Sequence, residues 1–222
     1  MILAAGRGER MRPLTDACPK PLLTVAGRPL VVWHLERLAR AGFRDIVINH
    51  AHLGAMIEDL LGDGSAWGLS LRYSPEPPGA LETAGGIRQA LPLLGEAPFL
   101  VVNGDIFCDW DFGRAARLPG PDDLIHLVMV PNPDHHPKGD FVLAGDRLAA
   151  AGDPRCTYAG IGVFRPELFH ALEAGRLARL APLLGQAIAA GRAGGELHRG
   201  LWTDVGTPAR LAGLDAAVRA GS

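Results

Sequence analysis

The residues best suited to chemistry lie near the N-terminus, in a glycine-rich basic loop that follows a short apolar strand. Gly6 and Gly8 carry no Cβ, so backbone N–H groups around them can approach a phosphate closely. Arg10 and Lys20, the latter held between two prolines, can neutralise phosphate oxygens that backbone dipoles alone would hold weakly. These residue types at this spacing predict a site for a nucleoside triphosphate.

Two familiar glycine motifs do not fit this loop. A dinucleotide fingerprint needs a third glycine where this chain has Met11, and an acidic residue where the second predicted strand ends in Asn49. The glycine, lysine and Ser/Thr of a P-loop follow none of the predicted strands. The two glycines alone are equally typical of an ordinary strand-to-helix turn, and the added arginine and lysine favour phosphate binding.

A second candidate is Asp105, which follows the buried strand predicted at 99–103. Open α/β sheets bind ligands beyond the carboxyl ends of their strands, which favours a role in binding. Asn103 and Gly104 could instead form only a tight turn, as Asn-Gly pairs often do. Asp204, far along the chain, favours the binding role, because two carboxylates can hold Mg²⁺ while a triphosphate completes the shell.

The segments that must position these residues alternate between strand and helix in the first half of the chain. Apolar periodicity and glycine stops predict strands at 2–5, 46–49, 69–73 and 99–103, and helices at 30–41, 56–61 and 83–91. The second half mixes strands at 125–130, 141–144, 147–149 and 158–164 with helices at 166–172, 177–190 and 208–220. Thr207 as N-cap and Pro208 at the first position open the last helix. This order predicts an α/β fold with a mixed, mainly parallel central sheet covered by helices.

The composition limits the classes of function. A chain of 222 residues suffices for one α/β domain with a substantial core. The net charge of −2 gives no reason to expect nucleic acid or a membrane as a partner, and no apolar stretch approaches the ~18 residues of a membrane span. Three cysteines without disulfide or metal-ligand spacing indicate a reducing, cytoplasmic setting.

Five segments together resemble the sugar-1-phosphate nucleotidyltransferase family. They are Leu-Ala-Ala-Gly-x-Gly-x-Arg-Met-x-Pro-Leu-Thr at 3–15, Pro-Lys-Pro at 19–21, Glu-Thr-Ala-Gly-Gly at 82–86, Asn-Gly-Asp at 103–105 and Trp-Thr-Asp-Val-Gly-Thr at 202–207. The resemblance covers nearly the whole chain. Further segments at 62–65, 91–95 and 135–141 are most similar to the short bacterial uridylyltransferases that act on N-acetylmuramate 1-phosphate in cell-wall sugar recycling.

The resemblance implies a single domain over residues 1–222, with the three-layer α/β/α nucleotidyltransferase (Rossmann-like) fold. It implies a nucleotide-binding half at about 1–110 and a sugar-binding half at about 111–222. The implied reaction is Mg²⁺-dependent transfer from UTP to a sugar 1-phosphate, which releases pyrophosphate and forms a UDP-sugar, expected to be UDP-N-acetylmuramate. The implied protein is a cytoplasmic monomer or small homo-oligomer.

The resemblance also assigns site residues. Arg10 and Lys20 become the catalytic cations, with Arg10 on the leaving pyrophosphate and Lys20 on the attacking phosphate and the α-phosphate. Asp105 and Asp204 become the metal-binding pair. The implied nucleotide-binding residues are Ala4, Ala5, Gly6, Gly8, Glu9, Arg10, Lys20, Glu82 and Gly85, and the implied sugar-binding residues are Asn103, Gly139 and Asp140.

The base and the sugar stay open between alternatives at the level of sequence. Glu82 suits the two N–H donors of guanine, but it is also typical of the first turn of a helix. Thymidylyl or guanylyl transfer to glucose or mannose 1-phosphate is the alternative reaction, and it is disfavoured because no Glu-Lys-Pro segment precedes the strand at 158–164. Lys138 or Arg199 could bind the lactyl carboxylate of muramate, and His135-His136 is expected to shape the sugar side. A non-catalytic sensor of nucleotide sugars would be expected to have lost the catalytic cations or the metal pair, and this chain retains them.

Overall fold

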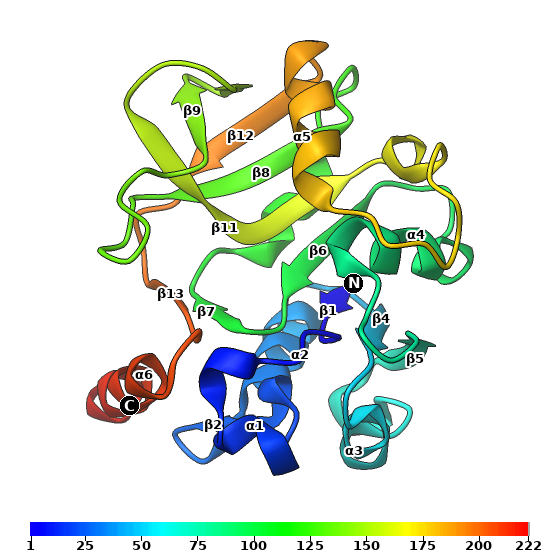
Figure 1. The fold of residues 1–222 in the computed structure, drawn as a ribbon, viewed down its shortest axis with the longest axis vertical. Coiled ribbons are helices and arrows are strands. Elements are labelled where there is room, and N and C mark those ends of the chain that lie inside the picture. The colour runs from blue at the N-terminus through cyan, green and yellow to red at the C-terminus, as the bar shows by residue number, and fades with distance from the viewer. Residues whose placement is uncertain (222) are drawn as a thin grey trace.

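The central feature of the fold is a nine-stranded mixed sheet, seen in a computed structural model that describes residues 1–221 (Figure 1). Its strands are β1 Ile2–Leu3, β4 Asp45–His50, β5 Ser70–Pro75, β6 Phe99–Asn103, β8 Ile125–Val130, β9 Phe141–Ala144, β10 Arg147–Ala149, β11 Arg155–Phe164 and β12 Ala193–Leu197. Their order is β5-β4-β1-β6-β11-β8-β12-β10-β9. Strands β5, β4, β1 and β6 are parallel, whereas β11 runs antiparallel between β6 and β8. The predicted α/β class and mixed sheet are confirmed, with parallel pairing concentrated in the first half of the chain.

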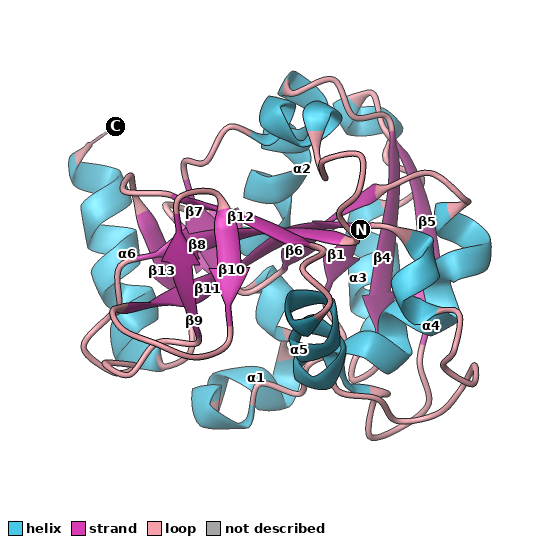
Figure 2. Cartoon of the chain, turned by 90° about the horizontal axis from the view of Figure 1, so that it is seen from above, coloured by secondary structure: helices cyan, strands magenta, loops and turns pink. Residues whose placement is uncertain are grey.

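Helices cover both faces of this sheet (Figure 2). They are α1 Leu14–Ala17, α2 Leu30–Arg40, α3 Gly54–Leu61, α4 Glu82–Leu94, α5 Leu180–Ala189 and α6 Pro208–Ala220. Successive strand residues point to opposite faces, so Ile46 and Ile48 join a core with α2 and α3 while Val47 joins a core with α4 and α5. Two cores separated by one sheet make the three-layer α/β/α arrangement.

Two short antiparallel pairs lie outside the central sheet. One joins β2 Thr24–Val25 to β3 Arg28–Pro29, and the other joins β7 Ile106–Cys108 to β13 Trp202–Asp204. The second pair places Asp204 opposite Ile106, and the Val205 N–H donates to the Asp105 carbonyl at 2.7 Å. Helix α6 packs beside β2 and β7 (Figure 1). A segment from the end of the chain therefore returns to the carboxyl end of β6.

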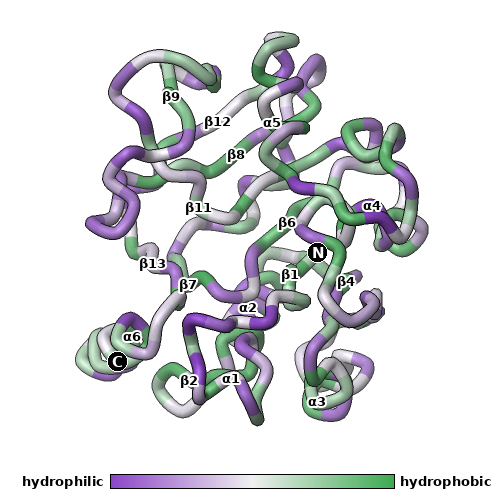
Figure 3. Tube along the Cα trace, viewed as in Figure 1, coloured by the Kyte–Doolittle hydropathy of each residue, from purple (hydrophilic) through white to green (hydrophobic). Residues whose placement is uncertain are grey.

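The hydropathy of the chain follows its layers. Hydrophobic residues trace the central strands β6 and β8, and hydrophilic residues gather in surface loops (Figure 3). The largest fully buried side chains include Phe112, Phe164 and Phe169. None of the helices within residues 1–221 combines the length and the apolar character needed to cross a membrane.

Several elements agree with the sequence patterns to the residue. The strands predicted at 99–103, 125–130, 141–144 and 147–149 are confirmed. The last helix is confirmed too: it begins at Pro208, and the Thr207 Oγ1 accepts the Arg210 backbone N–H at 3.3 Å. Local signals in the sequence, such as caps and turn residues, are sufficient to predict where these elements begin and end.

The helix predicted at 166–172 is wrong, because the chain forms only a 3₁₀ turn at Pro166–Phe169. Further along, the backbone at Ala178 bonds to the segment that opens α4. Ala178 accepts from the Ala84 N–H at 3.0 Å and donates to the Leu81 carbonyl at 3.0 Å. Helix α5 begins along the chain only after this contact between the loop and the start of α4.

Strand β12 has no counterpart among the sequence predictions, because Gly194 and Gly195 weaken strand propensity. Both glycines are needed for close packing. A Cβ at 194 would lie 2.9 Å from His126 Nδ1, and one at 195 would lie 2.9 Å from Leu148 Cδ2. The formation of this strand therefore depends on the packing of neighbouring side chains and not on strand propensity.

Candidate active site

A cavity of about 580 Å³ opens at the carboxyl ends of the parallel strands β1, β4 and β6. Open α/β sheets bind their ligands at this edge. The lining comes mainly from the N-terminal loop and from the segment that enters α4. Its residues are Leu3, Ala4, Ala5, Gly6, Arg7, Gly8, Glu9, Arg10, Met11, Lys20, Pro21, Asn49, Glu76, Gly79, Ala80, Glu82, Thr83, Asn103, Asp105 and Gly206.

The N-terminal loop lines this cavity with backbone and two arginines, of which Arg7 is bonded to Thr15 and Asp16. A Cβ added at Gly6 would meet nothing within 4 Å, so the backbone there faces open space. Gly8 turns the chain with φ 67°, and its carbonyl accepts the Thr15 hydroxyl at 2.8 Å. Met11 is fully buried and anchors the 3₁₀ turn that carries Arg10. Arg10 lines the cavity, and no hydrogen bond or ion pair engages it within residues 1–221.

Lys20 and Asp105 form an ion pair on the cavity wall. The Lys20 side chain is only 10% exposed, whereas that of Asp105 is 37% exposed. Pro19 in an extended conformation and Pro21 inside the 3₁₀ turn fix the backbone on both sides of the lysine. The ammonium group is therefore held at one point, next to the carboxylate that follows β6.

Asp204 lies beside this wall, but it does not line the cavity. Its carboxylate accepts from Arg210 Nη1 at 2.6 and 2.8 Å, and its Oδ1 lies 2.9 Å from His135 Nε2. Gly206 separates this cluster from the cavity, since a Cβ there would lie 2.0 Å from Arg210 Nη2. Of the two predicted metal carboxylates, Asp204 thus ends β13 and Asp105 immediately precedes β7, the strand that pairs with β13, and each already has a cationic partner.

No group of three or more His, Cys, Asp or Glu side chains within residues 1–221 is arranged to hold a metal ion. Asp105 and Asp204 alone would supply two oxygen ligands from neighbouring strands. Mg²⁺ prefers oxygen ligands and is commonly held by one or two carboxylates together with substrate phosphates. The donor set therefore fits Mg²⁺ that arrives with a phosphate-bearing ligand.

The opposite wall of the cavity is formed by the segment that enters α4. Ala80 and Glu82 line it in left-handed backbone conformations, with φ of 58° and 60°. The Glu82 side chain is exposed and lies 3.8 Å from Arg179. Gly85 faces away from the cavity, because a Cβ there would lie 2.4 Å from the Arg176 carbonyl.

The structure adds Asn49 and Glu76 to the candidate site, two residues that the sequence patterns did not single out. Both line the cavity, and both are buried, at 3% and 9% exposure. The position of Asn49 at the end of β4 is a signal that sequence reading could have used, because strand ends meet at this edge. Glu76 lies in a proline-rich loop and carries no comparable signal.

The predicted sugar residues divide between the cavity and a neighbouring loop. Asn103 lines the cavity and packs over Gly160, where a Cβ would lie 2.6 Å from its Nδ2. Gly139 and Asp140 do not line it. Asp140 accepts the Tyr158 N–H at 2.8 Å and pairs with His136 at 3.1 Å. Both carboxylate oxygens of Asp140 are thereby engaged, one within its own loop and one by β11.

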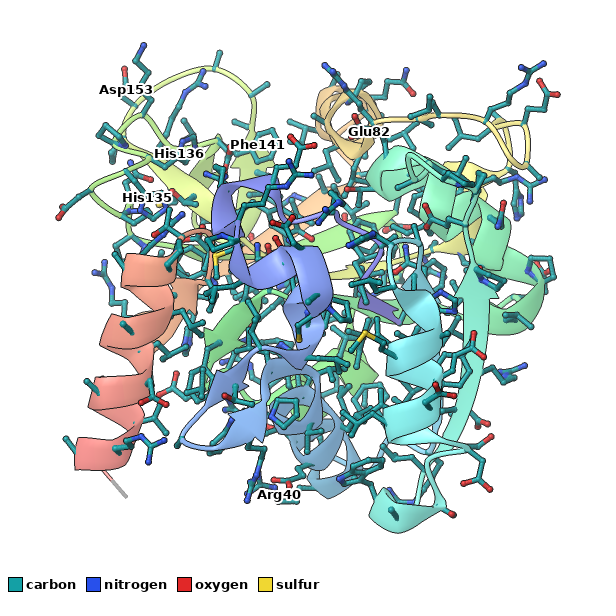
Figure 4. The ribbon with its side chains drawn as sticks, turned by 60° about the horizontal axis from the view of Figure 1, so that its bottom comes forward. Arg40, Glu82, His135, His136, Phe141 and Asp153 are labelled. Atoms are coloured by element: carbon teal, nitrogen blue, oxygen red, sulfur yellow. The ribbon has the colours of Figure 1, made fainter. Side chains whose placement is uncertain are left out.

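The loop of residues 131–140 does not line the first cavity, but its His135 contacts Asp204 beside that cavity. Figure 4 shows His135 and His136 on one side of the N-terminal loop and Glu82 on the other. A second cavity of about 500 Å³ lies at this loop, and its lining includes Lys138 and Arg155. Arg199 is exposed and lines none of the cavities described.

Two titratable groups near the site, the buried His34 and the partly buried Tyr158, have shifted pKa values. Burial lowers the pKa of His34 to about 4, so its imidazole is neutral in the core beside Phe112. Burial, together with the nearby Asp140 carboxylate, raises the pKa of Tyr158 above its ordinary range. Neither group exchanges protons near neutral pH, and both serve as packing.

Comparison with known proteins gives consistent matches. Residues 1–141 match the family described as nucleotidyl transferase. The chain is 58% identical to an N-acetylmuramate alpha-1-phosphate uridylyltransferase from Neisseria meningitidis serogroup B, over 95% of this chain and 94% of the relative. It is 37% identical to a protein of the same description from Caulobacter vibrioides, over 96% of this chain and 93% of the relative.

Solved structures agree on the fold. A candidate glucose-1-phosphate thymidylyltransferase from Bacillus anthracis, in complex with sucrose, superimposes with a TM-score of 0.85 at 21% identity and covers 98% of this chain and 94% of its own. HddC from Yersinia pseudotuberculosis, complexed with GMP-PN, gives a TM-score of 0.78 at 18% identity and covers 98% of this chain and 97% of its own. At these identities the likeness shows the shared fold.

Proposed function

The chain belongs to the nucleotidyl transferase family and is a sugar-1-phosphate nucleotidyltransferase, and we propose that it transfers uridylyl from UTP to N-acetylmuramate 1-phosphate. The products are pyrophosphate and UDP-N-acetylmuramate. The observation that carries the proposal is a cavity wall on which open glycine backbone, the unpartnered Arg10 and the fixed Lys20 converge. The choice of uracil and muramate is supported by the Neisseria relative, which matches over nearly the full length of both chains.

The reaction is an in-line attack by a sugar-phosphate oxygen on the α-phosphorus of the nucleotide. The attacking oxygen is already anionic, so no general base is needed, and catalysis consists of alignment and charge neutralisation. We assign Arg10 to the leaving pyrophosphate because its guanidinium has no competing partner. We assign Lys20 to the attacking phosphate and the α-phosphate, which requires its ammonium group to leave Asp105 for the phosphate oxygens.

We propose Asp105 and Asp204 as the residues that hold Mg²⁺. The ion, when bound, supplies positive charge that offsets the crowded phosphate oxygens. Before it binds, Lys20 and Arg210 neutralise the two carboxylates. Occupation of both carboxylates by a divalent ion would free these two cations to act on substrate oxygens.

We propose that residues 1–110 bind the nucleotide and residues 111–222 bind the sugar. In support, every cavity-lining residue except Gly206 comes from the first of these halves. The nucleotide residues are Ala4, Ala5, Gly6, Gly8, Glu9, Arg10, Lys20 and Glu82, with Gly85 acting by close packing beneath them. The sugar residues are Asn103, Gly139 and Asp140, the last two through the shape of the loop that they hold.

We further propose that the product serves cell-wall sugar recycling in the cytoplasm. The three cysteines are free thiols, which suits a reducing compartment. The assay that tests the proposal is pyrophosphate release in Mg²⁺, with UTP, dTTP and GTP crossed against N-acetylmuramate, N-acetylglucosamine, glucose and mannose 1-phosphates.

We expect turnover to be confined to UTP with N-acetylmuramate 1-phosphate. Asp105→Asn should abolish the metal-dependent turnover while the protein stays folded. Preference for dTTP or GTP with another sugar would replace the proposed substrates. The absence of turnover with every combination of nucleotide and sugar 1-phosphate would contradict the proposed reaction.

A further inference from the structure

A buried chain of hydrogen bonds crosses beneath the cavity and joins three segments that are distant in sequence. The Ala4 N–H donates to Asn49 Oδ1 at 2.9 Å, and Asn49 Nδ2 donates to Glu76 Oε1 at 2.6 Å. The Leu81 N–H donates to Glu76 Oε2 at 2.7 Å. Three bonds therefore connect the N-terminal loop, the end of β4 and the segment that enters α4.

Each group in this chain of hydrogen bonds has a fixed role as a donor or an acceptor. If the Asn49 amide flipped, its NH₂ would face the Ala4 N–H, and two donors would meet. Both Glu76 oxygens accept, and no cationic side chain pairs with them within residues 1–221. A buried carboxylate is costly unless its hydrogen bonds are satisfied, so this arrangement is strongly specified.

The packing around these residues leaves no room for a side chain at Gly86. A Cβ at Gly86 would lie 2.3 Å from Glu76 Oε1 and 2.9 Å from Asn49 Nδ2. Helix α4 therefore carries glycine at the position where the two side chains pass against it.

Both ends of the hydrogen-bond chain are cavity wall. Ala4 lines the cavity at one end. At the other end, Leu81 stands between Ala80 and Glu82, two cavity residues in left-handed conformations that ordinary residues adopt at a cost. Leu81 is held twice, by Glu76 through its N–H and by the Ala178 N–H through its carbonyl at 3.0 Å.

We propose that Asn49 and Glu76 are positioning residues that set the spacing between the loop for the triphosphate and the segment for the base. A nucleotide must contact both walls at once, so a fixed spacing lowers the cost of ordering them on binding. The inference rests on the proposed function only in taking the ligand to be a nucleotide. It assigns to this pair no contact with the reacting phosphates.

The test is an exchange of the acid and the amide. Asn49→Asp places two carboxylates against each other, and Glu76→Gln brings an amide NH₂ against either the Leu81 N–H or the Asn49 NH₂. In the double variant, the new carboxylate at 49 accepts from the Ala4 N–H and from the new amide at 76. The oxygen of that amide then accepts the Leu81 N–H. All three hydrogen bonds can therefore form again, and the negative charge has moved from position 76 to position 49.

The readouts are the Kd for UTP by calorimetry and the KM for each substrate, with thermal unfolding as a check of the fold. We expect each single variant to weaken UTP binding by about tenfold, in line with the loss of a buried charged hydrogen bond. The double variant should bind UTP within about threefold of the wild type. The KM for the sugar 1-phosphate should stay unchanged throughout, which a general loss of packing would not allow.

Gln89→Glu is the matched control. This amide-to-acid change affects a partly exposed side chain that donates to the carbonyl of Pro75, the residue before Glu76, at 2.5 Å, and it should leave UTP affinity unchanged. A double variant no better than the single variants would overturn the inference, and so would equal losses for both substrates. If the single variants do not fold, the double variant decides alone: near wild-type affinity supports the inference, and lost affinity overturns it. Wild-type protein that binds no nucleoside triphosphate would overturn the proposed function itself, whereas bound UTP with unresponsive single variants would overturn only this inference.

Discussion

The two sides of the site differ in how their polar groups are engaged. On the nucleotide side, Arg10 has no partner within residues 1–221, Gly6 faces open space and the backbone is held by buried hydrogen bonds. On the sugar side, Asp140 and Asp204 are each engaged by neighbouring side chains of their own chain. The wall proposed for the nucleotide keeps an unpartnered cation and open backbone beside the Lys20–Asp105 pair, whereas the carboxylates on the other side are already engaged.

This difference has a consequence for binding. Groups that are already fixed and unpartnered lose little when a ligand arrives, because their ordering was completed during folding. Groups that bond to each other must exchange partners before they can bind a sugar or a metal ion. We therefore expect the nucleotide wall to bind first, and the sugar wall to adjust around the bound nucleotide.

The largest effect should come from Lys20→Ala, because the variant removes a fixed cation from the wall where phosphate charge builds up. We expect kcat to fall by about 10²–10³ while UTP binding is retained. The comparison is sharpened by Lys138→Ala, which removes the chain's other lysine from the sugar-side loop and should leave kcat within about threefold. Steady-state kinetics on both variants provides the measurement, and equal losses of kcat would break the distinction between the walls.

Arg10→Ala should have the next largest effect. The guanidinium is free to bind the triphosphate, and loss of a charged hydrogen bond typically costs tenfold to a hundredfold in affinity, so we expect about that increase in the Kd for UTP. Arg40→Ala is the control, since this exposed arginine lies at the end of α2 away from Glu82 and His135 (Figure 4). Unchanged UTP affinity in Arg10→Ala would remove this residue from the phosphate site.

The smallest effect should come from Arg210→Gln on the sugar side. Arg210 Nη1 sits against both oxygens of Asp204, where a cation would bind, so its removal leaves only His135 beside the carboxylate. We expect Mn²⁺, titrated by electron paramagnetic resonance without nucleotide, to bind about twofold to fivefold more tightly, the range of a partly exposed ion pair. Arg219→Gln on the same helix, which loses only the pair with Asp215, should change nothing. Weaker Mn²⁺ binding in Arg210→Gln would mean that the arginine orients Asp204 instead of competing for it.

Much of the wall proposed for the nucleotide could be predicted from the sequence. The glycine loop and Lys20 are contiguous in the chain, and their chemistry can be read from local spacing. Asp105 follows a strand whose apolar run is unmistakable. Residues that act close to their sequence neighbours leave a local signal.

The rest of the site depends on approaches between distant segments, which no local pattern encodes. Glu76 belongs to the site only because the end of β5 brings it into hydrogen-bond contact with Asn49. Gly86 is needed only because the side chains of Asn49 and Glu76 pass against α4. Asp204 meets His135, which lies far earlier in the chain, and comes close to Asp105 only through the return of β13 to β7. The loop at Ala178 likewise bonds to the start of α4, and α5 begins at Leu180 instead of at the predicted residue 177.

The measurement that tests the two-wall account most directly is calorimetry of the wild-type protein with each ligand separately. A non-hydrolysable UTP analogue with Mg²⁺ should bind without any sugar phosphate, whereas N-acetylmuramate 1-phosphate should give measurable heat only after the analogue is bound. Binding of the sugar phosphate alone, as tight as in the presence of the analogue, would contradict the account. It would show that the sugar wall is as prepared for its ligand as the nucleotide wall.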